Sequence, residues 1–122
     1  MKILHLPLKA QWYNMIESGE KTEEYRMITP YWYQRLYQRK PEFAYAGRIS
    51  KSDAEYACDP DLRYILTCEG FKDELRPYTH VLFRYGYTRR TMLREIDSIT
   101  IGRGNPKWGA PTEKDVFIIK FS

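Results

Sequence analysis

The chain has 122 residues, of which 30% are charged and 43% are hydrophobic, and its net charge is +4 at pH 7. This length suits one domain with its own core, and this composition argues against intrinsic disorder. No apolar run approaches the roughly 20 residues of a membrane span, and residues 1–7 are too short for the apolar part of a signal peptide. The mild basic excess permits an anionic partner without requiring one.

Cysteine and histidine are too sparse to suggest a metal centre. Cys58 and Cys68 lack C-x-x-C spacing, and His5 and His80 are isolated in the sequence. We therefore expect no metal, no cofactor and no membrane partner, in a reduced protein of the cytoplasm. The sequence leaves the oligomeric state open, with a monomer slightly favoured.

The chain is expected to begin with a strand and a helix. Residues 1–6 form an apolar strand that Pro7 ends. Apolar residues then recur at helical spacing over 8–16, so we expect Trp12 on the inner face of this helix and in the core. Gly19 follows at the position where a left-handed cap favours glycine.

A second strand and a second helix follow. Residues 20–26 alternate like a strand, and Thr29-Pro30 gives an N-cap with proline at the first helical position. The helix is predicted over residues 31–39, where Arg35 and Arg39 lie one turn apart. This spacing predicts a basic ridge on the helix, although a solvated helix face is the simpler explanation of the two arginines.

The middle of the chain gives weaker patterns. A short strand is predicted over 43–49, a helical turn over 52–57, and a helix or strand over 62–68, with Asp59-Pro60 marking a break before the last. We interpret residues 40–77 as an elaboration on a core that the two ends of the chain form.

The end of the chain predicts consecutive strands. β-rich segments occupy 78–87 and 91–102, with a change of phase near Asp97-Ser98 that indicates a bulge. A glycine-rich loop over 102–110 precedes a closing strand over 116–121, whose unbroken apolar run suits a central position. The overall order predicts an α+β fold with a mostly antiparallel β-barrel and two or more flanking helices.

The sequence Gly19-x-Lys21-x-x-Glu24-x-Arg26 places three charged side chains in one short segment. Strand alternation alone would direct Lys21 away from the face that Glu24 and Arg26 share. All three converge only if the chain is still turning at Lys21, so that the regular strand begins at residue 22 or 23. A structural ion-pair triad is the simplest alternative to a functional site.

This motif is similar to the G-x-K-x-x-E-x-R signature of the ASCH family, which belongs to the PUA-like superfold. Trp12 and Ile16 in the preceding helix also fit, as does Gly102-x-Gly104-x-Pro106-x-Trp108-Gly109 before the last strand. The resemblance covers residues 1–38 and 78–122. It implies a single PUA-like domain over residues 1–122, with 40–77 as a divergent elaboration, and a cleft that Lys21, Glu24 and Arg26 line.

PUA-like relatives are mostly associated with RNA, and some small members of the family are amidohydrolases of acylated cytidine. In those enzymes the position of Glu24 is a nucleophilic threonine, and a catalytic glutamate lies between the last two strands. Here Glu113 matches no such motif, and Thr22 should point away from Lys21. These departures disfavour the enzyme, so we expect a binding domain for RNA or a nucleotide-like ligand.

The expected ligand contacts are Lys21, Glu24 and Arg26, with Tyr25 or Trp108 stacking on a base and Lys107 nearby. A track for phosphates would add Arg89, Arg90 and Arg103. Two alternatives stay open at this point. One is a small hydrolase or nuclease that uses Lys21 and Glu24 as catalytic residues, and the other is a structural or regulatory interaction module. A buried triad would favour the structural role.

Overall fold

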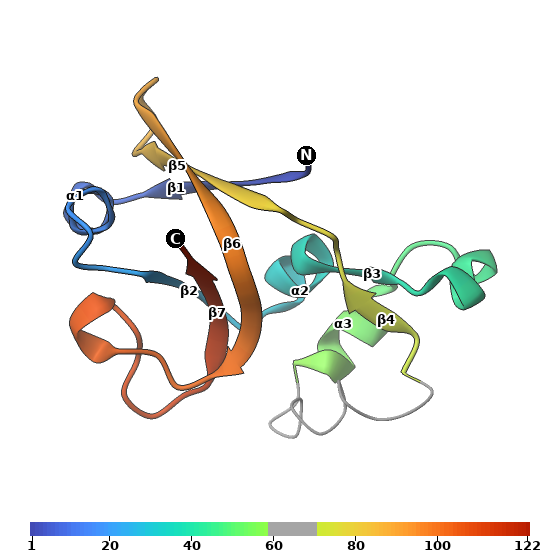
Figure 1. Cartoon of the computed structure of the whole chain (residues 1–122). Helices are drawn as coiled ribbons and strands as arrows, with labels where there is room; N and C mark the ends of the chain where they lie inside the picture. Colours follow the sequence, from blue (N-terminus) through green and yellow to red (C-terminus); the bar gives the residue numbers. More distant parts are fainter. Residues whose placement is uncertain (59–70) are drawn as a thin grey trace. The chain divides into compact units, whose positions relative to one another are not determined.

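The computed structural model describes residues 1–58 and 71–122, and these residues form an α+β fold (Figure 1). They divide into two compact units. Unit 1 comprises residues 1–26 and 77–122, and unit 2 comprises residues 27–76. In the described residues no helix combines the length and apolar character needed to cross a membrane. The predicted helix or strand over 62–68 lies outside the described residues.

Unit 1 is built on a five-stranded sheet in the order β1-β5-β6-β7-β2. The strands are β1 (Ile3–Leu8), β2 (Glu23–Met27), β5 (His80–Tyr85), β6 (Thr91–Gly102) and β7 (Val116–Phe121). Antiparallel pairing joins β5 to β6 and β6 to β7, whereas β1 lies parallel to β5, so the sheet is mixed. Its edges are β1 and β2, and no pairing between them closes a barrel within the described residues.

The first strand extends further than the sequence predicts. Pro7 was expected to end it, but β1 continues through Pro7 to Leu8. Proline lacks a backbone N–H, which is tolerated because β1 is an edge strand with a partner on one side only. The carbonyl of Pro7 consequently remains near the end of the strand, where it becomes an acceptor in the candidate site.

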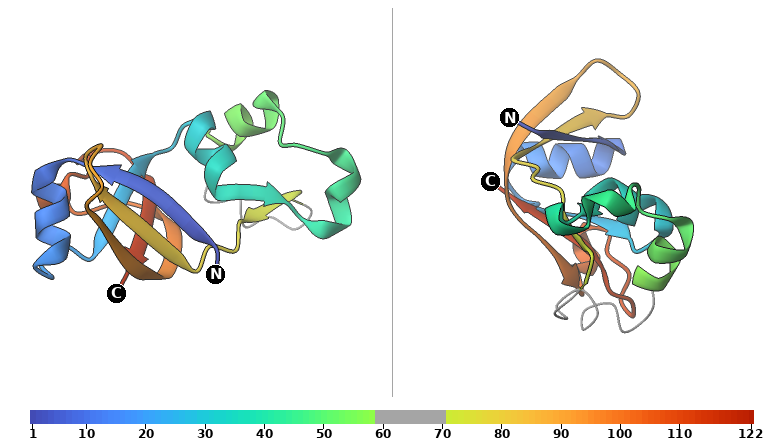
Figure 2. Two further views of the ribbon diagram at one scale, coloured as in Figure 1. Left: turned by 90° about the horizontal axis from the view of Figure 1, so that it is seen from above. Right: turned by 90° about the vertical axis from the view of Figure 1, so that its right-hand side faces the viewer.

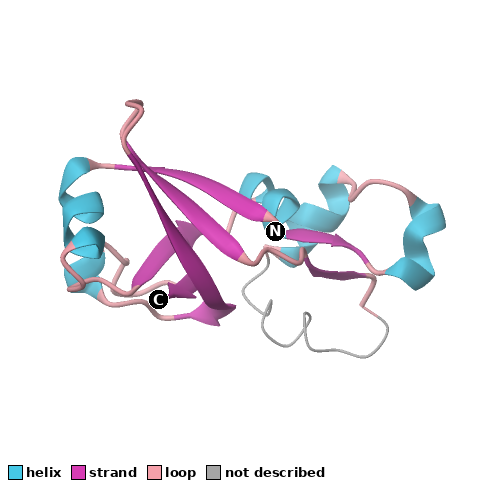
Figure 3. Cartoon of the chain, turned by 45° about the horizontal axis from the view of Figure 1, so that its top comes forward, coloured by secondary structure: helices cyan, strands magenta, loops and turns pink. Residues whose placement is uncertain are grey.

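The long strand β6 has the predicted bounds and the predicted irregularity. Its register against β7 shifts between Ile96 and Ser98, where the phase of the sequence changes. Figures 1 and 3 show β6 curving along its length, as a bulged strand does. β7 lies between β6 and β2 and is therefore an interior strand, as its apolar run predicts.

The core of unit 1 lies between the sheet and helix α1 (Ala10–Glu17), which Figure 2 shows beside the strands. Buried side chains alternate along β1, and Phe83 of β5 packs on Phe121 of β7 with ring centroids 4.9 Å apart. The helix contributes Tyr13 and Ile16 to the core. Trp12 is only half-buried, contrary to expectation, because the helix presents Tyr13 to the sheet and Trp12 to the candidate site.

Unit 2 begins with helix α2 (Pro30–Leu36). The Thr29 hydroxyl accepts a hydrogen bond from the Trp32 backbone N–H, which confirms the predicted cap. The helix ends three residues earlier than predicted, because Tyr37–Arg39 forms strand β3 antiparallel to β4 (Asp73–Leu75). Arg39 is therefore not on the helix, and the predicted ridge with Arg35 was wrong.

Two further helical segments follow in unit 2. The predicted strand over 43–49 was wrong, because Pro41–Ala46 forms the 3₁₀ segment η1, which Pro41 begins. The predicted helical turn over 52–57 is helix α3 (Lys51–Ala57). Ser50 and Asp53 form a reciprocal capping box at its start, which accounts for the helix despite its short length.

Candidate functional site

The corner between α1 and β2 determines where the Lys21 side chain points. Gly19 has φ +87°, a left-handed conformation that ends the helix, and the Lys21 backbone N–H donates to the Met15 carbonyl at 3.0 Å. Regular strand geometry begins only at Glu23. The chain is thus still turning at Lys21, which confirms that Lys21 and Glu24 converge although strict alternation would separate them.

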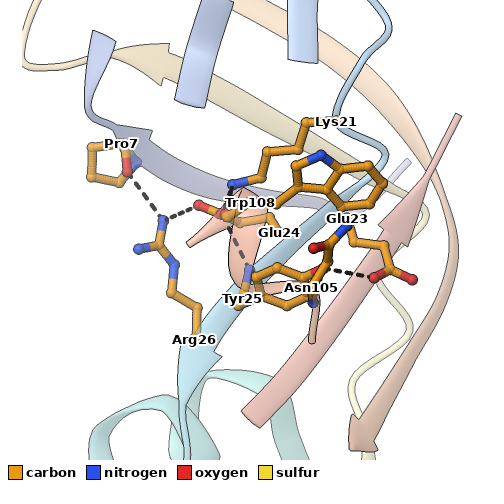
Figure 4. A network of polar contacts seen from close by, with 8 residues as sticks. All are labelled: Pro7, Lys21, Glu23, Glu24, Tyr25, Arg26, Asn105 and Trp108. Atoms are coloured by element: carbon orange, nitrogen blue, oxygen red, sulfur yellow. Dashed lines mark hydrogen bonds and ion pairs between the residues drawn. The ribbon is translucent and has the colours of Figure 1, made fainter. Parts of the chain in front are cut away.

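The Lys21 ammonium is buried among polar and aromatic partners, and Figure 4 shows it beside Glu24 and Trp108. Nζ donates to Glu24 Oε1 at 2.9 Å and to the Trp108 carbonyl at 2.8 Å. It also lies 4.4 Å from the centroid of the Trp12 ring, within cation–π distance. Only 1% of Lys21 is exposed, so its ammonium links Glu24 and the Trp108 carbonyl inside the protein.

Glu24 bridges the two cations of the motif. Oε1 accepts from Lys21 and from the Tyr25 backbone N–H at 3.1 Å, and Oε2 lies 3.2 Å from Arg26 Nη2. The same Arg26 nitrogen donates to the Pro7 carbonyl at 3.1 Å. The Arg26 side chain is 21% exposed, against 6% for Glu24. Arg26 is therefore the member of the triad that reaches solvent.

The electrostatics of the triad follow from burial. Burial lowers the pKa of Lys21, while the charge of Glu24 and its hydrogen bond oppose this shift and Arg26 adds to it. With both cations and the carboxylate ionised, the cluster carries one net positive charge. A cluster of this kind favours an anion or a group rich in acceptors.

A pocket of about 180 Å³ opens beside the triad, and we call it the site pocket. Its lining comprises Pro7, Leu8, Lys9, Trp12, Glu24, Tyr25, Arg26, Trp108 and Gly109. Gly109 has φ +99°, and a Cβ there would lie 2.9 Å from the Trp12 ring. Glycine at this position lets the loop after β6 lie against Trp12, so that Trp12 and Trp108 both border the pocket.

Tyr25 is mainly a structural member of the site. It is 8% exposed, its hydroxyl donates to Glu23 Oε1 at 2.8 Å, and the same oxygen accepts from the Asn105 backbone N–H at 2.9 Å. Burial raises the pKa of Tyr25 to about 12. A Cβ at Gly104 would lie 2.6 Å from its ring, so the loop is closely packed on Tyr25. Tyr25 thereby fixes the loop that carries Trp108.

The remaining predicted contacts lie outside the lining of the site pocket. Lys107, on the 3₁₀ segment η2 (Pro106–Trp108), is exposed, as is Arg89. Arg90 binds Glu17 through Nη2 at 2.8 and 2.9 Å, and Arg103 binds Asp115 at 3.1 Å. Two members of the predicted phosphate track are thus already paired with carboxylates.

Several pocket residues escaped the sequence analysis. The Pro7 carbonyl and Lys9 carry no sequence signal for a site, since a proline at a strand end and an exposed lysine are both common. Trp12 was assigned to the core. Its position on the helix that leads to the motif was the available signal.

The described residues include no candidate site for a metal ion. Among residues 1–58 and 71–122, no group of three or more His, Cys, Asp or Glu side chains is arranged to hold a metal ion. His80 Nδ1 lies 2.8 Å from the Thr79 hydroxyl.

Unit 2 contains a second polar cluster, which we call the Arg39 cluster. Arg39 donates from Nη1 to Asp73 at 3.0 Å and from Nη2 to Asp53. The Tyr33 hydroxyl donates to the other oxygen of Asp73 at 2.7 Å, and burial followed by this hydrogen bond raises the pKa of Tyr33. The cluster joins α2, β3, α3 and β4, so it stabilises the fold of unit 2.

Comparison with models of protein families, with curated proteins and with solved structures finds no match to this chain.

Proposed function

We propose that the chain is an ASCH-type domain that binds RNA or a nucleotide-like ligand, with one planar base entering the site pocket. The proposal includes a PUA-like arrangement of unit 1. It rests on the G-x-K-x-x-E-x-R motif, on the placement of α1 between β1 and β2, and on the consecutive strands β5, β6 and β7. The convergence of Lys21 and Glu24 at the corner before β2 adds support from the geometry.

The observation that carries the proposal is the combination of a hydrogen-bonding edge with two aromatic side chains. Glu24 and Arg26 line the pocket with an acceptor and a planar donor fork, and Trp12 and Trp108 border it. Bases are recognised by hydrogen bonds along their edges and by stacking on aromatic rings. A volume of about 180 Å³ lies below the ~300 Å³ at which drug-sized sites begin, so the pocket suits one ring.

The members of the triad differ in burial, so we assign them different roles in binding. Lys21 is enclosed and fully committed to protein partners, so it positions Glu24 and does not contact the ligand. Arg26 is partly exposed and lines the pocket, so it is the principal ligand contact. This division keeps the structural role that burial favours for Lys21 and leaves a binding edge at Arg26.

A hydrolase is the second candidate, and the lowered pKa of Lys21 is the observation that favours it. A neutral lysine could accept a proton from a nucleophile. However, Nζ already donates to Glu24 and to the Trp108 carbonyl, and both oxygens of Glu24 already contact protein donors. A structural or regulatory module is the third candidate, and it requires no ligand in the pocket.

The test is a titration of the purified protein with short single-stranded RNA and with nucleosides at several salt concentrations. We expect saturable binding that weakens as salt rises, because phosphate contacts release counterions. Arg26→Ala should cost roughly 1–3 kcal/mol of binding if the guanidinium reads a base edge. Trp108→Ala should also weaken binding through lost stacking.

The matched control is Arg94→Ala, which removes an arginine from β6 that is not part of the pocket lining. The affinity of this variant for RNA and nucleosides should equal that of the wild type, apart from a small decrease because the net charge falls by one. Lys21→Ala is unsuitable as a binding variant, because it removes a buried partner of Glu24. Absence of saturable binding to any probe, or equal losses for Arg26→Ala and Arg94→Ala, would reject the proposal.

A further inference from the structure

Unit 2 contains a larger pocket that is separate from the G-x-K-x-x-E-x-R motif, and we call it the arginine pocket. It encloses about 480 Å³ and is lined by Gln34, Gln38, Arg39, Gly47, Arg48, Ile49 and Arg76. This volume falls within the range of ~300–1,000 Å³ that is typical of small-molecule sites. Three arginines and two glutamines among these residues make the lining strongly polar and basic.

The fold of unit 2 holds the arginines in place. Arg76 follows β4, and its Nε and Nη2 donate to the Gln34 carbonyl at 3.3 and 3.1 Å. Arg39 is fixed by Asp53 and Asp73 in the Arg39 cluster. Gly47 has φ +72°, which allows the turn that leads from η1 into Arg48.

The charged groups of the arginine pocket are unevenly placed. Arg39 faces two aspartates, which leave one excess negative charge in the Arg39 cluster, whereas the bonds that hold Arg76 go to a neutral carbonyl. Across the described ranges 1–58 and 71–122, neither Arg48 nor Arg76 forms an ion pair with a carboxylate. Among the described residues, the lining includes no acidic side chain. Two guanidinium charges are therefore available to attract an anion.

Other donors and one nearby carboxylate complete the chemistry. Arg39 Nε is buried and makes no hydrogen bond to the part of the chain that the structure describes. Gln34 and Gln38 carry amides that both donate and accept. Gln38 Nε2 donates to Glu74 at 3.4 Å, so Glu74 adds a negative charge that would oppose an anion, beside the excess negative charge of the Arg39 cluster.

We propose that the arginine pocket binds a small phosphorylated molecule of mononucleotide size. Arg48 and Arg76 hold its phosphate, because a guanidinium fork matches phosphate oxygens and keeps its charge at all physiological pH values. Gln34 and Gln38 contact its uncharged part. A lone phosphate would leave much of the 480 Å³ unfilled, which is why the ligand is larger than the anion itself. This site goes beyond the proposed function and is independent of it.

The experiment is an NMR titration of the ¹⁵N-labelled protein at low salt with AMP, with adenosine and with inorganic phosphate. We expect AMP to shift the amide signals of residues 34–49 and 76. Adenosine and phosphate should each bind more weakly, because each lacks one half of the ligand. Arg48→Ala should weaken AMP binding roughly tenfold or more, the equivalent of one hydrogen bond to a charged group.

Two variants sharpen the result. Glu74→Gln should strengthen AMP binding, because it removes the opposing charge. Arg94→Ala in unit 1 loses the same charge as Arg48→Ala and should leave the affinity unchanged. If Arg76→Ala fails to fold because Gln34 loses its partner, Arg76→Lys retains the charge but loses the fork, and it should weaken binding without unfolding the protein.

Three outcomes would overturn the proposal: equal shifts with AMP and adenosine, equal losses for Arg48→Ala and Arg94→Ala, or AMP shifts confined to the site pocket. Arg26→Ala separates this site from the site pocket. It should leave the AMP response of residues 34–49 unchanged even if binding of RNA or nucleosides elsewhere is lost.

Discussion

The two units each bury a cluster of ions, and the two clusters are composed in opposite ways. In unit 1, two cations share the single carboxylate of Glu24. In unit 2, two carboxylates share the single guanidinium of Arg39, and a tyrosine hydroxyl donates to one of them. The first cluster has an excess positive charge next to a small pocket, whereas the second has an excess negative charge that internal donors satisfy.

The difference shows what a buried charge contributes in each place. The carboxylates around Arg39 join four elements that are distant in the sequence, and the Asp73 side chain is only 2% exposed. In the motif, the outer member Arg26 is 21% exposed and lines a pocket. In the Arg39 cluster the most exposed member is Asp53, at 42%, so the accessible charge is positive in the motif and negative in the Arg39 cluster.

The largest effect should come from removing the buried cation of the motif. Lys21→Ala leaves Glu24 buried with one cationic partner and removes a hydrogen bond to the Trp108 carbonyl. Breaking a buried ion pair from one side costs about 3–5 kcal/mol, which we expect in the free energy of unfolding from urea titrations.

The control for this prediction is Lys107→Ala, which removes an exposed lysine of the neighbouring loop and should change stability by less than about 0.5 kcal/mol. A loss below ~1 kcal/mol for Lys21→Ala would mean that the pair contributes little and that the motif is not structural.

A smaller effect is expected in unit 2 from Tyr33→Phe. This change removes the hydroxyl that donates to Asp73 at 2.7 Å and leaves the stacking with Tyr37 intact. Leaving a buried acceptor without this donor should cost about 1–3 kcal/mol of unfolding free energy. Tyr31→Phe, on the exposed side of the same helix, is the matched control, and equal losses for the two variants would contradict the assignment.

The Arg39 cluster should also give a modest dependence of stability on pH. Desolvation acts to raise the pKa of Asp53, but hydrogen bonds from Ser50 and Arg39 outweigh it and lower the pKa. A carboxyl with a lowered folded-state pKa stabilises the protein above its unfolded pKa of ~3.9 and loses this contribution as the pH falls through the folded value.

Unfolding free energy should therefore decline below about pH 4, and less steeply in Asp53→Asn than in the wild type. The Asp53 side chain is 42% exposed, so the difference should be small. Urea titrations from pH 6 to pH 2.5 measure it, with Asp97→Asn as the comparison in unit 1. Parallel profiles for the wild type and Asp53→Asn would contradict this account.

The smallest effect should be catalytic. We expect the wild type to release free cytidine from an acylated cytidine weakly or not at all, because Glu24 cannot replace the threonine nucleophile of the similar amidohydrolases. Glu24→Thr should recover at most slight activity. Turnover near the ~10 s⁻¹ of a typical enzyme, abolished by Glu24→Gln while the fold is preserved, would make the hydrolase the better assignment.

The sequence by itself determined much of unit 1. Gly19 predicted the helix end, the phase change near residue 97 predicted the bulge in β6, and the cap at Gly19 allowed a late start of β2 that brings Lys21 beside Glu24. These features depend on backbone preferences and side-chain periods over a few residues. Local order of this kind is encoded where it occurs, so it can be read without knowing the rest of the fold.

Only the tertiary structure decided the partners of the charged groups. No local pattern links Arg39 to Asp53 and Asp73, which lie 14 and 34 positions away and meet through the pairing of β3 with β4 and the packing of α3. Arg39 lies in β3 and not in the predicted helix, because pairing with β4 outweighed a weak helical preference. Likewise, Trp12 borders the site pocket because the loop at Gly109 lies against it. Burial and long-range contact, which a periodicity cannot specify, assigned these side chains their roles.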